Sequence, residues 1–137
     1  MRRLIRTTLA AGLLAASACG GGAPTTTPPA ALPEQSVEVA GVTVAATPER
    51  IDSTGAVLQL KLDTHSTPLE MDLPAAAHLS VGGRDWPART WNGPGPGGHH
   101  REGTLIFSPA GPAEGPVRLV VDGLAEPAVL TWTEVPR

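Results

Sequence analysis

The stretch that decides the fold is Ala56-Val57-Leu58-Gln59-Leu60-Lys61-Leu62-Asp63-Thr64-His65-Ser66-Thr67. Beyond residue 34 it is the longest run that contains neither Gly nor Pro. Leu58, Leu60 and Leu62 alternate with polar residues, and this period of two puts the leucines on one face of a β-strand. An amphipathic helix would need apolar residues spaced three and four apart. The run therefore predicts a strand with one buried face.

The chain after residue 36 is divided by Gly and Pro into further short apolar runs. The expected strands cover residues 37–44 (with a bulge or kink at 40–41), 78–81 and 86–91 around a turn at 82–85, 104–107, 117–122 and 128–133. Roughly six to eight strands at such spacing are typical of a β-sandwich. We therefore predict an all-β, immunoglobulin-like sandwich of about seven strands over residues 36–137, with a small β-barrel as the alternative.

The N-terminal residues have the features of an export signal. A basic start, Met1 to Arg6, precedes an apolar run over residues 9–16 that is too short to span a bilayer. The segment Ala16-Ser17-Ala18-Cys19 resembles a bacterial lipobox, although Ala16 stands where a larger aliphatic residue is usual. The resemblance implies a lipoprotein signal peptide over residues 1–18 and a lipid on Cys19. The protein would then be anchored to the cell membrane or outer membrane with its domain on the extracytoplasmic side; an unlipidated signal peptide is the alternative.

Residues 19–35 and the net charge narrow the choice of partners. This segment is rich in Gly, Pro and Thr without apolar periodicity, which predicts a tether. Removal of residues 1–18 takes away three of the 10 basic residues and none of the 13 acidic ones, leaving a net charge of −6. Nucleic acid is therefore not expected as a partner.

Because Cys19 is the only cysteine, the domain depends on its core, or on a metal, rather than on an internal disulfide.

Three histidines are the candidate metal ligands. His65 follows the best predicted strand, and His99 and His100 follow a loop rich in Gly and Pro. If the sandwich brings the three together at one end, their imidazoles suit copper or zinc. Asp63 and Asp72 are possible further ligands or supports for the imidazoles. The metal hypothesis predicts a binding module that holds a transition metal at the envelope.

The glycines of this loop decide whether both adjacent histidines can bind one ion. Neighbouring residues in a regular strand point to opposite faces, so the backbone at Gly97 and Gly98 would have to be distorted. The alternative hypothesis is architectural. Asp63 would accept a hydrogen bond from one imidazole, Arg101 would pair with a carboxylate, and Trp91 would help to support the loop. The protein would then be a structural or protein-interaction component of the envelope.

An enzyme is not expected. Asp63, His65 and Ser66 supply the residue types of a hydrolase triad, but successive residues of a strand alternate in direction and do not converge on one proton path. Ser66 also lacks the Gly-x-Ser-x-Gly context of a nucleophile elbow. The partners expected from the sequence are the membrane, through Cys19, and a metal ion or an envelope protein.

Several short motifs together resemble an uncharacterised domain of exported bacterial and archaeal proteins. They are Leu62 to Ser66, Asp72-Leu73, Trp91 to Pro94, Gly97 to Gly103 and Leu105 to Phe107. The resemblance covers roughly residues 37–133. It implies a common fold and a common site around these motifs, and it names no reaction.

Overall fold

The computed structural model describes residues 20–22 and 31–135. The predicted signal peptide (residues 1–18), Cys19, and residues 23–30 of the predicted tether lie outside the described residues. The described part holds nine strands and one short helix: β1 (Gln35–Val39), β2 (Val42–Asp52), β3 (Gly55–Thr64), α1 (Leu73–Ala76), β4 (Ala77–Val81), β5 (Arg84–Trp86), β6 (Ala88–Asn92), β7 (His100–Phe107), β8 (Val117–Val121) and β9 (Ala128–Trp132). No helix among these residues is long and apolar enough to cross a membrane.

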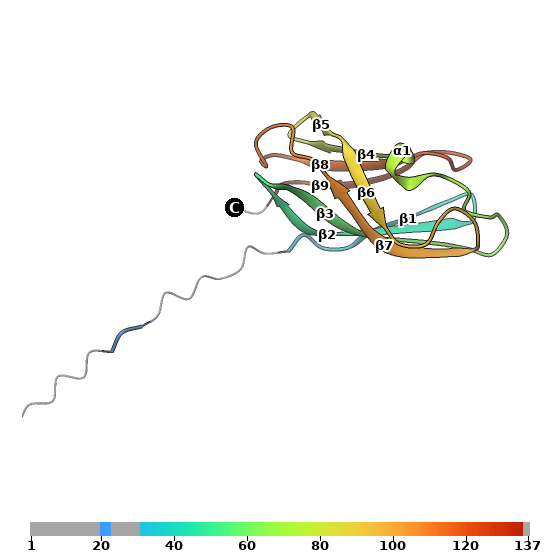
Figure 1. Cartoon of the computed structure of the whole chain (residues 1–137), viewed down its shortest axis with the longest axis horizontal. Helices are drawn as coiled ribbons and strands as arrows, with labels where there is room; N and C mark the ends of the chain where they lie inside the picture. The colour runs from blue at the N-terminus through green and yellow to red at the C-terminus, as the bar shows by residue number, and fades with distance from the viewer. Residues whose placement is uncertain (1–19, 23–30, 136–137) are drawn as a thin grey trace, which may run out of the picture.

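The strands form two antiparallel sheets packed face to face (Figure 1). One sheet has the order β1-β2-β3-β7-β6 and the other has the order β5-β4-β8-β9. If β1 is left aside, the orders β2-β3-β7-β6 and β5-β4-β8-β9 are those of strands A-B-E-D and C′-C-F-G in immunoglobulin domains. The predicted immunoglobulin-like sandwich is confirmed, and the described strands form no closed barrel.

Two segments expected as single strands are each divided in two. Ala40 and Gly41 have φ of 49° and 80°, which form a tight two-residue turn, so residues 37–44 belong to the β1–β2 hairpin. Residues 86–91 are divided at Pro87, which has no N–H to give to a strand ladder. Trp86 pairs with Leu79 in the four-stranded sheet, whereas β6 pairs with β7 in the other. The sandwich therefore has nine strands instead of about seven.

The alternation in β3 supplies one side of the core. Leu58, Leu60 and Leu62 are completely buried. Facing them from the four-stranded sheet are residues such as Leu79 and Leu119, which are also buried. Each such leucine stabilises the fold by about 1.5–3 kcal/mol relative to an exposed position. The core is continuous across both sheets and does not depend on a disulfide.

The N-terminal segment joins the sandwich at the end opposite to the predicted histidine site. Trp132, the last residue of β9, donates from Nε1 to the carbonyl oxygen of Pro33 at 2.7 Å. Leu32 packs against the core, and β1 begins at Gln35, the last residue of the predicted tether. In Figure 1 this end of the molecule lies at the left, while the loop that follows β3 and the loop that precedes β7 lie at the right.

Candidate functional site

Two loops at one end of the sandwich are joined by main-chain hydrogen bonds. The His65 loop (residues 65–72) follows β3, and the His99 loop (residues 93–99) precedes β7. Leu69 N donates to Gly98 O at 2.9 Å, and Gly97 N donates to Leu69 O at 2.8 Å. The two loops therefore form a single surface, which we call the distal end.

Two glycines give the His99 loop its backbone path. Gly97 has φ of 108° and Gly98 has φ of 74°, in the left-handed region that strains residues with a side chain. A Cβ atom placed on Gly98 would meet nothing within 4 Å. The backbone conformation, and not a lack of space, is therefore what requires glycine at this position.

Arg101 lies beneath both loops at the start of β7. Its side chain occupies the inward-facing register that Leu105 and Phe107 continue further along the strand, and it pairs across the ladder with Leu62. The residue is only 1% exposed. A charged side chain thus takes a core position at the end of the sandwich, where only hydrogen bonds and nearby charges can compensate the loss of water.

The guanidinium group of Arg101 binds the main chain of both loops. Nη1 donates to the carbonyl oxygens of Leu69 and Met71 at 3.2 and 2.7 Å, and Nη2 donates to that of Pro94 at 3.1 Å. These carbonyl oxygens stand in place of the carboxylate expected from the sequence. The planar fork of arginine suits this role because its donors are fixed in direction and can reach separate acceptors at once.

Trp91 covers the guanidinium group from the side of β6. The Cζ atom of Arg101 lies 5.7 Å from the centroid of the Trp91 ring, within the range of a cation–π contact. The indole Nε1 of Trp91 donates to Pro94 O at 2.8 Å, the same oxygen that accepts from Arg101. Burial lowers the pKa of Arg101, and the negative charges of Asp72 and Glu70 oppose that shift. Arg101 and Trp91 together hold the His99 loop against the sandwich.

His100 lies on the outer face of the five-stranded sheet, not in the loop surface. It is the ladder partner of Asp63, and its Nδ1 makes a short contact with Asp63 Oδ1. Its Nε2 lies 3.7 Å from Glu102 Oε2, and Lys61 Nζ lies 4.0 Å from Glu102 Oε1. The hydrogen bond with Asp63 raises the pKa of His100, with further contributions from the charges of Asp63 and Glu102 against desolvation and Lys61. Both His100 and Asp63 are more than half exposed, so water weakens this interaction.

The other predicted ligands are placed differently. His65 is exposed in the loop just after β3 ends, and His99 is exposed while its carbonyl oxygen accepts from Thr64 N at 2.9 Å. Asp72 is exposed at the N-cap of α1 and makes no side-chain capping bond. Across residues 20–22 and 31–135, no three His, Cys, Asp or Glu side chains come close enough together to hold a metal ion. The arrangement of these residues does not fit the three-histidine site.

Several groups that hold the distal end were not expected from the sequence. Leu69 is 1% exposed, and it contributes both its side chain to the core and its main chain to the loop bonds. The carbonyl oxygens of Met71 and Pro94 are acceptors that no side-chain pattern marks. One signal was available: Arg101 keeps the two-residue period of Leu105 and Phe107, which places it on the core face.

Comparison with known proteins gives no match: no family model, no curated protein and no solved structure matches this chain. The role of the distal end is therefore inferred from its geometry alone.

Proposed function

We propose that this protein is a lipid-anchored, extracytoplasmic interaction module that presents its distal end to another protein of the envelope. The observation that carries the proposal is the position of the braced loops at the end of the sandwich opposite to Pro33, where the N-terminal segment joins. A lipid on Cys19 would hold the Pro33 end near the membrane. The His65 and His99 loops would then face away from it.

The rigidity of the distal end supports a binding role. Its main-chain path is fixed by Arg101, by the bonds between Leu69 and the His99 loop, and by glycines with positive φ. A surface that is ordered before it meets a partner loses less conformational freedom on binding. The exposed imidazoles of His65 and His99 and the prolines of the His99 loop would supply the contacts.

A metal ion is the other partner class predicted for this end. His100 is engaged by Asp63 on the sheet face, away from the loop surface, and the described residues hold no group of three possible ligands. We therefore place the binding role in contact with a protein and not in coordination of copper or zinc.

Two experiments test the proposal separately. In a bacterial host, the full-length protein should fractionate with membranes and incorporate labelled fatty acid, and Cys19→Ala should abolish both. If Cys19→Ala keeps both the membrane association and the fatty-acid label, the lipid anchor is refuted.

The second experiment asks which end makes contact. A photo-crosslinking amino acid at Pro96, in the His99 loop, is compared in native cells with the same group at Ser53, an exposed position in the turn between β2 and β3. A discrete adduct from position 96 and none from position 53 is expected. Equal adducts from both positions, or none from position 96, would refute a contact role for the distal end.

A further inference from the structure

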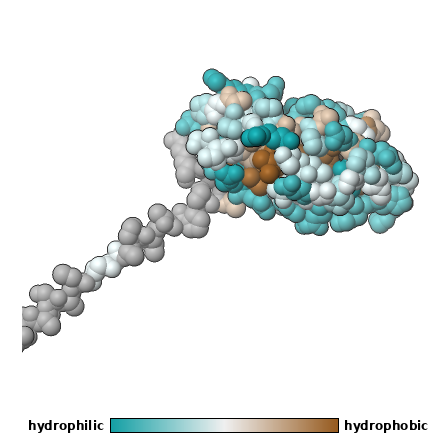
Figure 2. All heavy atoms as spheres, viewed as in Figure 1, coloured by the Kyte–Doolittle hydropathy of each residue, from teal (hydrophilic) through white to brown (hydrophobic). Residues whose placement is uncertain are grey.

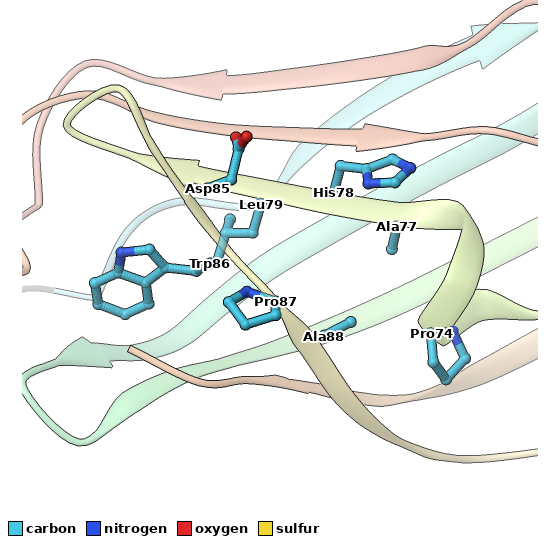
Figure 3. A pocket seen from close by; sticks show the side chains of 8 residues that line it. All are labelled: Pro74, Ala77, His78, Leu79, Asp85, Trp86, Pro87 and Ala88. Carbon is cyan, nitrogen blue, oxygen red and sulfur yellow. The ribbon is translucent and has the colours of Figure 1, made fainter. Parts of the chain in front are cut away.

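The outer face of the four-stranded sheet carries a charged row of side chains next to an apolar one. The charged row crosses all four strands from ladder partner to ladder partner: Asp85, Ser80, Arg118 and Thr131. The apolar row lies two residues further along the strands and contains Val120 and its partner Val129. Both rows face away from the core, because the neighbouring residues in each strand are buried. Figure 3 shows this alternation, with Asp85 on the side of the sheet opposite to Leu79.

The charged row contains one acid and one base that do not pair with each other. Neither Asp85 nor Arg118 forms an ion pair within the part of the chain that the structure describes. β4 lies between their strands, which places them about 10 Å apart. The nearby His78 is already paired with Asp122 at 3.2 Å. A row with one free acid and one free base is complementary to a second copy of itself.

A two-fold axis parallel to the strands brings these charges together. It reverses the strand order and keeps each row opposite itself, so Arg118 of one copy faces Ser80 of the other and lies beside its Asp85. The contact is made twice, because a two-fold interface is reciprocal. The same axis points both Pro33 ends in one direction, so both copies can be anchored in one membrane.

The apolar row adds a small hydrophobic contact. Val129 is the one large hydrophobic side chain that stands exposed among the described residues, at 38%. In the view of Figure 2, by contrast, hydrophobic residues are recessed among hydrophilic ones. Four strands with about five residues each give a face of roughly 300 Å², which is below the ~800 Å² that each partner buries in a stable complex. The association is therefore weak in solution, and anchoring in one membrane would raise the effective concentration.

We propose that this face pairs two copies of the protein side by side. Two reciprocal ion pairs between Arg118 and Asp85 set the register, and the rows of Val120 and Val129 supply the apolar contact. The pairing uses a sheet face and not the loops of the distal end, so it does not depend on the contact role proposed there.

Sedimentation equilibrium of residues 20–137, which contain all nine described strands, measures the association. The protein should be monomeric at micromolar concentration and partly dimeric at millimolar concentration in low salt. High salt should weaken the dimer, because it screens exposed ion pairs. A protein that stays monomeric at millimolar concentration would overturn the proposal.

Reversing the two charges separately gives the decisive test. Arg118→Asp leaves only acids at the facing positions and Asp85→Arg leaves only bases, so each variant should self-associate at least about tenfold more weakly than wild type. In an equimolar mixture, every facing pair again joins an acid and a base, and dimerisation should return to within about threefold of wild type. A mixture that associates no better than the separate variants, or separate variants that dimerise like wild type, would refute pairing through this face.

Two controls complete the experiment. At micromolar concentration both charge variants should melt within about 3 °C of wild type, because both positions are exposed; weaker association is then not a result of unfolding. Val129→Thr should weaken the dimer severalfold, whereas Val57→Thr, the same change on the outer face of the other sheet, should leave it unchanged. Equal effects of the two threonine variants would contradict contact through the apolar row.

Discussion

Replacing Arg101 with Met removes the group that joins both distal loops to the sandwich while it nearly keeps the side-chain length. The variant loses hydrogen bonds to three carbonyl oxygens, those of Leu69, Met71 and Pro94. A hydrogen bond to a charged group contributes about 1.5–3 kcal/mol, so their gross loss is roughly 4–9 kcal/mol. Removal of a buried charge returns several kcal/mol of that loss.

The net expectation for Arg101→Met is a loss of about 3 kcal/mol in the free energy of unfolding. For a domain of this size that corresponds to a fall of about 12–15 °C in the midpoint of thermal unfolding. Chemical denaturation followed by tryptophan fluorescence measures the free energy, and Arg118→Met, on the exposed face of β8, is the matched control. The control should change stability by less than about 0.5 kcal/mol.

Hydrogen exchange shows where the loss acts. In Arg101→Met, the amides of Leu69 and Gly97, which donate between the two loops, should exchange faster. The amide of Leu60 in β3 should lose only the protection that follows from the lower global stability. Arg101→Lys keeps the charge but loses the fork, so it should be intermediate. A loss below about 1 kcal/mol in Arg101→Met, or unchanged exchange in both loops, would refute the bracing role.

Three further outcomes are expected. The stability that wild type gains over His100→Gln should be full below pH 6.5 and fall as pH rises through the raised pKa of His100, in thermal melts across pH 5–9; a pH-independent difference would contradict this. Gly98→Ala should lose about 1–2 kcal/mol in denaturant unfolding because of its positive φ, whereas Gly95→Ala, at a position with open space, should lose clearly less. Equimolar zinc or copper should leave the melting midpoint unchanged; a rise of several degrees that His65→Ala and His100→Ala remove would restore the metal hypothesis.

The strand pattern was predictable because it is a local property. The period of two in β3 requires only neighbouring residues, and it placed Leu58, Leu60 and Leu62 in the core as observed. The hairpin at Ala40 and Gly41 was missed because a turn and a kink leave the same local signal. Its turn was recognisable only once the ladder between β1 and β2 was seen.

The candidate site was only partly predictable because its contacts join distant residues. The pairing of Asp63 with His100 agrees with the architectural hypothesis, in which Asp63 accepts from an imidazole. The position of His65 and His99 depends on how two loops close, and they do not join His100 in a group that fits a metal. The acceptors of Arg101 are main-chain oxygens, which no residue type identifies in advance.

The sequence by itself determined the class of the fold and the face on which each strand residue lies, because alternation and turn residues act within a few positions of the chain. Only the tertiary structure decided which of these faces meet. Packing the two sheets placed Arg101 beneath carbonyl oxygens as far as 32 residues away and moved the chain between sheets at Pro87. These features arise from the closure of long loops around one core, a cooperative outcome that no local segment specifies.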